Sequence, residues 1–197
     1  MTTEGPRRNS STCTGRAASI QRSAHAFNGE QMIRPSEPRT GIRYDGRRQS
    51  VAPGDIARGV GRLLWSLGLA SVTELSLTTG RRADVVGLSK NGEVWIVEIK
   101  SSVEDLRADQ KWPEYRGFCD RLWFAVAPAF PQQLLPFDAG LIIADRYGGE
   151  IAREAPAVRL HTARRKAMTL RLARVAALRL QSLADPDLDI EAGRRTG

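Results

Sequence analysis

Two charged residues, Asp84 and Glu98, lie within two otherwise apolar runs of the sequence, residues 83–88 and 94–99, and a third, Lys100, directly follows the second run. Apolar residues at successive positions are typical of strands that are covered on both faces. A charge in such a strand is costly unless it is paired or binds a metal ion. Two converging carboxylates suit Mg²⁺ or Mn²⁺ better than zinc, because no histidine or cysteine is near. The lysine could orient a water molecule or stabilise charge on a phosphate oxygen.

The turn between the two runs decides whether the three charges meet. Glu98 and Lys100 are two residues apart in a strand, so they point to the same face. A two-residue turn at Asn91 and Gly92 would pair Asp84 with Ile99 and send the aspartate to the opposite face. A three-residue loop, residues 90–92 with a left-handed glycine, would instead pair Asp84 with Glu98. Both loops suit these residues, and we choose the second on chemical grounds, since only it gathers the three charges.

An aspartate, a hairpin and then Glu-x-Lys resemble the motif of the PD-(D/E)XK, restriction-endonuclease-like nucleases. The alternative is that the motif occurs by chance, in two strands whose charged residues form ion pairs only with one another. Longer stretches of the chain favour the first interpretation, because they resemble the MmcB-like DNA-repair family over about residues 50–183. These stretches are residues 80–85, 96–102, 105–121, 140–150 and 163–166.

The resemblance implies an α/β fold, with a mixed central sheet flanked by helices as in restriction endonucleases. It also implies a role in DNA damage repair, with DNA as the partner and other repair proteins as further candidates. Asp84 and Glu98 would hold Mg²⁺ (or Mn²⁺), Lys100 would face the attacked phosphate, and no small-molecule cofactor is expected. Related nucleases often take a further acidic ligand ahead of the hairpin, and Glu74 is the candidate; a solvent-facing strand glutamate is the alternative.

The candidates for DNA contact are basic or aromatic residues on both sides of the hairpin. Superfamily members carry a Gln and a Tyr on a helix near the site, and Gln110 and Tyr115 resemble that pair, with a longer spacing and Pro113 between them. For each basic residue, a solvated surface position is the alternative. The predicted DNA-binding residues are Arg82, Lys111, Tyr115, Arg164 and Arg165.

Charge is unevenly distributed along the chain. The 197 residues carry a formal net charge of +8, and residues 1–50, with nine Arg, no Lys and four acidic residues, account for +5 of it. Residues 1–49 are rich in Arg, Ser and Gly and show no sustained periodicity, which predicts a disordered tail. We expect a nuclease-like domain over residues 50–184 and a frayed end over residues 185–197. Whether residues 1–31 are expressed stays open, because Met32 is a later candidate start.

Composition also bears on the compartment. No apolar run is long enough to span a bilayer and no signal-peptide pattern opens the chain, so no membrane contact is expected. The two cysteines, Cys13 and Cys119, are far apart in sequence and indicate neither a disulfide framework nor a zinc site. We therefore expect a cytoplasmic protein.

The remaining elements must position the charged residues. Folding is expected to begin near Pro53, with a helix whose apolar residues recur at helical spacing over residues 56–67, and residues 71–77 alternate as a strand does. Ser102 is the expected cap of a helix, with Asp105 three residues on. Further strands are expected over residues 121–127 and 140–144 and near Ile151. A last helix, residues 162–183 with Thr162 as cap, has an apolar stripe that includes Met168 and Leu183.

Three functions are consistent with these patterns. The leading hypothesis is a metal-dependent DNA nuclease acting in repair. The second is a catalytically silent module of the same fold that binds DNA or recruits a partner. The third is a structural protein in which the three charges pair only with one another. The intact triplet of Asp84, Glu98 and Lys100 favours the first.

Overall fold

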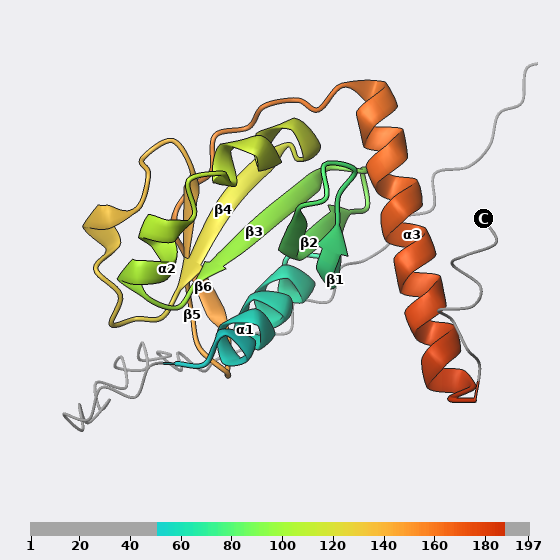
Figure 1. Cartoon of the computed structure of the whole chain (residues 1–197), viewed down its shortest axis with the longest axis horizontal. Helices are drawn as coiled ribbons and strands as arrows, with labels where there is room; N and C mark the ends of the chain where they lie inside the picture. Colours follow the sequence, from blue (N-terminus) through green and yellow to red (C-terminus); the bar gives the residue numbers. More distant parts are fainter. Residues whose placement is uncertain (1–50, 188–197) are drawn as a thin grey trace, which may run out of the picture. The chain divides into compact units, whose positions relative to one another are not determined.

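The computed structural model describes residues 51–187. They form a mixed sheet with helices on both faces, which confirms the predicted α/β class (Figure 1). The elements in chain order are α1 Pro53–Ser66, β1 Leu69–Ser76, β2 Arg82–Ser89, β3 Val94–Lys100, α2 Val103–Ala108, the 3₁₀ helix η1 Trp112–Phe118, β4 Arg121–Val126, the 3₁₀ helix η2 Gln132–Leu134, β5 Gly140–Ala144, β6 Gly149–Arg153 and α3 Thr162–Ala184.

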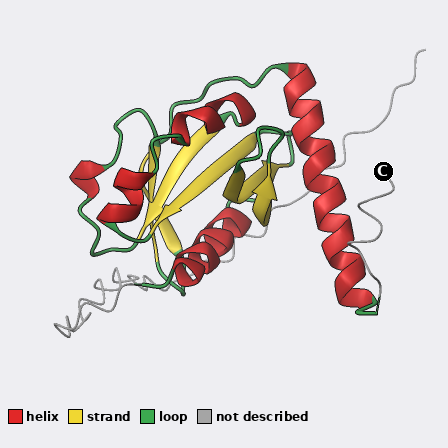
Figure 2. Cartoon of the chain, in the orientation of Figure 1, coloured by secondary structure: helices red, strands yellow, loops and turns green. Residues whose placement is uncertain are grey.

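The six strands lie in chain order across one sheet, β1-β2-β3-β4-β5-β6. Figure 2 draws the strands in yellow and the helices in red. The first three form an antiparallel meander. Strands β3, β4 and β5 are parallel, and β6 returns antiparallel to β5 at the far edge. Because parallel neighbours need a crossover, α2 and η1 lie between β3 and β4 in the chain. The carboxyl end of β3 therefore leads directly into these two helices.

One face of the sheet is covered by α1. Its side chains Ile56, Val60 and Leu64 are fully buried and pack with Val97 and with the β4 residue Trp123. A glycine at position 59 allows the close approach of the β5–β6 turn, because a Cβ there would lie 2.0 Å from the carbonyl oxygen of Asp145. The predicted helix is thus confirmed, and it begins at Pro53, where folding is expected to begin.

The opposite face is covered by η1, α2, η2 and α3. The first half of α3 packs Met168 and Leu172 against η1 and the first strands of the sheet. Beyond Leu172 the helix has no buried residue, and Leu183, predicted to belong to the packing stripe, is 80% exposed. That part of the prediction is wrong, because α3 extends past the edge of the sheet (Figure 1). The cap is also His161, whose Nδ1 accepts the Ala163 N–H at 3.4 Å, and not Thr162.

Most other predicted elements are confirmed with small changes in their ends. The strand expected over residues 71–77 is β1, and the strand near Ile151 is β6. No helix among residues 51–187 has both the length and the apolarity needed to cross a membrane. The predicted tail over residues 1–49 lies outside the described residues, as does most of the predicted frayed end.

Candidate functional site

The β2–β3 turn pairs the strands in the register that brings the charges together. Val85 lies opposite Val97 and Leu88 opposite Val94, so Asp84 comes level with Glu98. The loop spans residues 90–92: the Ser89 N–H donates to the Glu93 carbonyl at 3.0 Å, and Gly92 has a φ of +79°. The three-residue loop that we chose on chemical grounds is confirmed. With the shorter turn, every side chain of β2 would have changed face.

Asp84 and Glu98 each bind the backbone of the other's strand. The regular backbone pairing of β2 with β3 ends at Val85 and Val97. Beyond these residues the two strands are joined by hydrogen bonds from side chains to backbone N–H groups. Asp84 Oδ2 accepts the Ile99 N–H at 2.8 Å, and Glu98 Oε1 accepts the Asp84 N–H at 3.4 Å. These contacts hold both carboxylates at the point where β2 and β3 separate.

The pair is electrostatically costly when both groups are charged. Glu98 is 3% exposed. Burial, and then the charge of Asp84, raise the pKa of Glu98 to about 8, against the opposing effect of Lys100. Burial also raises the pKa of Asp84. A cation between the two carboxylates would remove this cost, since an opposite charge favours the ionised form.

Lys100 is buried and has a partner that sequence reasoning did not assign. Its Nζ lies 2.7 Å from Asp109 Oδ2, and the lysine is 4% exposed. Asp109 ends α2, a helix capped as predicted: the Asp105 N–H donates to Ser102 Oγ at 3.1 Å. The missed signal is spacing, because residues four apart share one face of a helix, and both Asp105 and Asp109 line the site.

Glu74 reaches the site through an unusual backbone. It has a φ of +53°, in the left-handed region that a glutamate rarely adopts. Alternation along β1 breaks there, since Leu69 packs in the α1 cluster while Leu75, an even number of residues away, packs on the other face. The Glu74 carboxylate pairs with Arg82 Nε at 2.6 Å. The predicted additional acid therefore faces the site, with an arginine as its present partner.

These side chains surround one cleft of about 420 Å³ at the carboxyl end of β3. Its lining holds five acidic residues and only two basic ones, so it repels a phosphate unless a cation is bound. The ionisable residues of the lining are Glu74, Arg82, Asp84, Glu98, Lys100, Asp105, Asp109 and Tyr115.

The donor set suits a weakly held divalent ion of the magnesium type. Within residues 51–187 no three His, Cys, Asp or Glu side chains are arranged as a complete metal cage. Mg²⁺ does not need one, because it is usually held by one or two carboxylates, with waters and substrate phosphates as the remaining ligands. Asp84 and Glu98 supply two carboxylates, and Glu74, whose Oε2 pairs with Arg82, is a further candidate. The residues present fit this kind of site.

The predicted DNA-contact residues are not gathered in one place. Arg82 and Tyr115 line the cleft, and the Tyr115 hydroxyl donates to the Arg82 carbonyl at 3.1 Å. Burial raises the pKa of that hydroxyl further above its usual range. Lys111 is exposed and lies outside the lining. So does Gln110, whose amide donates to the Arg107 carbonyl at 2.8 Å.

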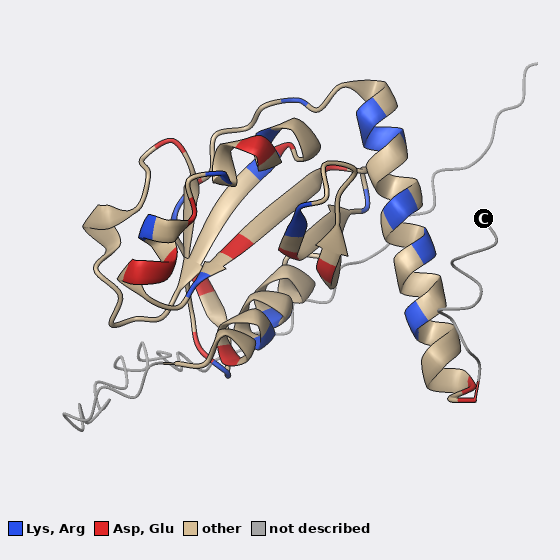
Figure 3. Ribbon diagram, in the orientation of Figure 1, with Lys and Arg blue, Asp and Glu red and all other residues tan. Residues whose placement is uncertain are grey.

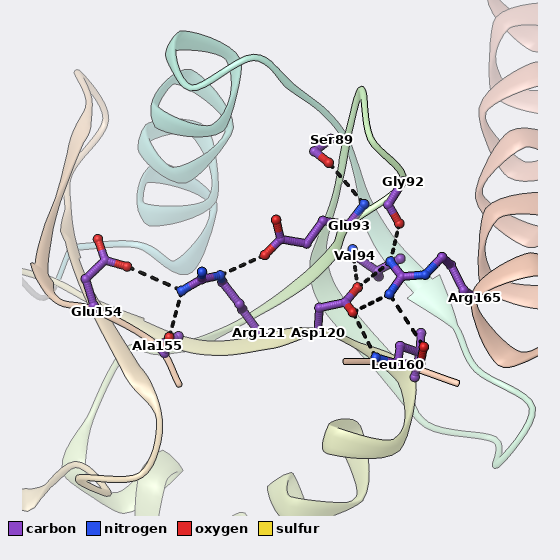
Figure 4. A network of polar contacts seen from close by, with 10 residues as sticks. All are labelled: Ser89, Gly92, Glu93, Val94, Asp120, Arg121, Glu154, Ala155, Leu160 and Arg165. Atoms are coloured by element: carbon purple, nitrogen blue, oxygen red, sulfur yellow. Dashed lines mark hydrogen bonds and ion pairs between the residues drawn. The ribbon is translucent and has the colours of Figure 1, made fainter. Parts of the chain in front are cut away.

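Arg165 has a structural role that the sequence did not reveal. Its guanidinium binds both carboxylate oxygens of Asp120, and its Nη1 also donates to the Gly92 carbonyl (Figure 4). Asp120 in turn accepts the N–H groups of Val94 and Leu160, each at 2.8 Å. This network ties α3 to the hairpin loop and leaves little of Arg165 for a phosphate. Arg164, by contrast, is exposed and donates to the Gly117 carbonyl at 2.9 Å.

Comparison with known proteins relates the chain to one family and to a solved structure. The family described as DNA repair protein MmcB-like matches residues 41–187. A solved structure, the SPO1766 protein of unknown function from Silicibacter pomeroyi, is similar in sequence and fold. The two share 48% sequence identity with a TM-score of 0.68, over 70% of this chain and 94% of that one. Among curated proteins, none matches the chain.

Proposed function

Since the chain belongs to the MmcB-like DNA repair family, we propose that it is a nuclease of the PD-(D/E)XK type that hydrolyses DNA phosphodiesters with Mg²⁺ or Mn²⁺. One observation carries the proposal: Glu98 is buried beside Asp84, with Lys100 two residues on, in a cleft dominated by acidic residues. A purely structural role would not need two adjacent carboxylates whose pKa values are both raised, that of Glu98 by burial and by Asp84, and that of Asp84 by burial. Sites that bind cations do contain such pairs.

In this proposal Asp84 and Glu98 hold the ion, which would neutralise charge on the attacked phosphate as a Lewis acid. The reciprocal backbone hydrogen bonds of the two carboxylates keep them oriented. Lys100 is positioned by Asp109, and its ammonium has further N–H donors for a water molecule or a phosphate oxygen. The attacking water would form the new P–O bond while the bond to the leaving sugar oxygen breaks.

A second candidate function is a catalytically silent DNA-binding or partner-recruiting module of the same fold. The observation that favours it is the pair of internal salt bridges, Lys100–Asp109 and Arg82–Glu74. These salt bridges occupy Glu74, Arg82 and Lys100, three charged groups that a nuclease would use to bind the metal ion or the substrate.

The deciding experiment is a cleavage assay of the purified full chain. Single-stranded, double-stranded, flapped and abasic DNA are incubated with Mg²⁺, Mn²⁺ or EDTA, with melting curves measured in parallel. We expect cleavage that requires the metal and is abolished by Glu98→Gln. The matched control is Glu150→Gln, because Glu150 is an exposed glutamate outside the cleft.

Two results would decide against the nuclease. Cleavage that persists undiminished in Glu98→Gln would point to a contaminant or another site. A wild-type protein that neither cleaves any of the four DNAs nor gains stability from either metal would leave the silent module as the better account.

A further inference from the structure

A second cavity, of about 720 Å³, lies beside η1. Its walls are η1, the connector over residues 156–161 and the first half of α3, and we call it the arginine groove. It contains no acidic residue in its lining. Its basic residues are Arg116, Arg159, His161, Arg164 and Arg171.

The absence of acid extends along the chain that forms two of these walls. Residues 155–184 contain no Asp or Glu. Figure 3 shows the result on α3, where basic positions recur along the helix with no acidic position among them. The first turn of α3 also lacks the acidic residues that usually complement a helix N-terminus. An anion in the groove would relieve this concentration of positive charge.

Two of the groove's arginines, Arg159 and Arg171, form no ion pair with an acidic side chain of the described residues. Among the described residues, Arg159 is exposed and forms no ion pair. Arg171 has a buried Nη1 with no hydrogen-bond partner. A buried cationic donor without a partner is costly, so Arg171 would gain stability by turning this nitrogen outward to an anion in the groove. Arg116 and Arg164 are partly engaged, with Asp138 and with the Gly117 carbonyl.

The arginine groove and the cleft both take part of their lining from η1. Tyr115 lines the cleft and its neighbour Arg116 lines the groove. Thr78 and Thr79, in the β1–β2 turn, form the groove's opposite rim, a few residues from Arg82 in the cleft. A polyanionic chain that follows η1 can therefore meet both cavities.

We propose that the arginine groove binds the phosphate backbone of the DNA strand outside the catalytic cleft, through Arg159 and Arg171. The inference rests on the proposed function only in taking DNA as the ligand. In this inference the groove supplies most of the affinity for DNA and the cleft carries out the hydrolysis, because the acidic cleft by itself repels phosphate. Backbone contacts of this kind are insensitive to sequence and weaken as salt is added.

The test measures binding separately from cleavage. The full chain carrying Glu98→Gln is titrated in EDTA with labelled single-stranded and duplex DNA over a range of salt concentrations. Adding Arg159→Gln and Arg171→Gln should weaken binding about tenfold at 0.1 M salt and reduce the salt slope by about one to two. Arg174→Gln, on an exposed position of the same helix, and Arg58→Gln, on α1, are the matched controls and should change affinity less than twofold.

A local readout excludes effects of folding and of charge elsewhere. An arginine-selective dicarbonyl reagent is applied with and without DNA, and modification is mapped by mass spectrometry. DNA should protect Arg159 and leave Arg58 as reactive as before. Arg159→Gln alone, at an exposed position, should show a smaller loss of affinity than the double variant.

Unchanged binding by the double variant, or equal reactivity of Arg159 with and without DNA, would overturn the inference. Protection by a phosphopeptide but not by DNA would overturn it too and would indicate a protein partner. These outcomes are independent of the nuclease: normal cleavage with no effect of the arginines leaves the proposed function standing. If DNA protects Arg159 but the protein cleaves no DNA, the proposal of DNA binding in the arginine groove stands and the proposal of nuclease activity falls.

Discussion

Glu98 is the residue whose ionisation couples the site to the stability of the fold. Its pKa is raised to about 8 by burial and by Asp84. At pH values between its unfolded pKa and about 8, the native state keeps a proton that the unfolded chain releases. The contribution of Glu98 protonation to the free energy of unfolding is therefore complete below the pKa that Glu98 has in the unfolded chain. It is lost as the pH rises through the pKa that Glu98 has in the folded protein.

Replacing Glu98 by Gln should remove this pH dependence. We expect the free energy of unfolding of wild type to fall, relative to Glu98→Gln, by on the order of a few kcal/mol between pH 5 and pH 8.5 in EDTA. Urea denaturation at three pH values measures it. Glu150→Gln should run parallel to wild type, and a parallel Glu98→Gln curve would mean that Glu98 titrates normally.

Lys100 and Asp109 should respond differently to substitution. Lys100→Ala removes the cation that compensates Glu98 and Asp84, so it should destabilise by about 1–3 kcal/mol. In Asp109→Asn the lysine loses its ion-pair partner but stays near the charges of those two carboxylates, so the loss should be smaller than in Lys100→Ala. Cleavage should fall in both variants, because Lys100 is then absent or displaced from its position.

Chemical denaturation and single-turnover cleavage separate the two effects. Asp138→Asn, which removes an exposed ion pair with Arg116, is the control and should alter neither quantity appreciably. If Asp109→Asn cleaves at the wild-type rate, Asp109 does not position the lysine.

At the scale of elements, the hairpin loop and α3 are joined through one buried ion pair. Burial raises the pKa of Asp120, but the Arg165 guanidinium and the N–H groups of Leu160 and Val94 outweigh it, and the net pKa is lowered. This contribution to stability is present above the unfolded pKa and is lost as the pH falls through the folded one. The same network holds the loop that sets the register of Asp84 and Glu98.

Arg165→Met should therefore act as a stability mutation. It leaves the Asp120 carboxylate buried without its cation, at a cost of about 3 kcal/mol. DNA affinity per folded molecule should stay within about twofold of wild type. Thermal melting and the anisotropy titration give the two values. A large loss of affinity with an unchanged melting temperature would restore Arg165 as a DNA contact.

At the scale of the whole molecule, charge is divided between the first 50 residues and the rest, as +5 and +3 of the total of +8. Removing residues 2–49 takes away nine arginines and four acids. From composition we expect the melting temperature to shift by less than about 2 °C, because such a segment buries little apolar surface. Non-specific DNA affinity and its salt slope should both decrease.

Differential scanning calorimetry and the salt titration of the truncated protein measure these effects. A loss of several degrees would show that the segment docks on the domain. An unchanged salt slope would show that its arginines do not contact DNA.

Local chemistry explains what the sequence by itself determined. The apolar runs, the Asn-Gly turn and the alternation of side chains narrowed the hairpin to two registers, because these signals act over a few residues. Ser102 and Asp105 likewise predicted the start of α2, since a cap is satisfied within one turn of helix. The identities of Asp84, Glu98 and Lys100 as a unit followed from such local rules and from the family resemblance.

Only the tertiary structure decided the partners of these charges. Lys100 binds Asp109 because α2 returns over the end of β3, and Arg165 binds Asp120 because α3 meets the hairpin loop. Glu74 faces the cleft through a left-handed φ that its residue type disfavours. Each of these depends on how distant elements pack. A buried charge takes whichever opposite charge the packing brings within reach, and spacing along the chain does not encode that distance.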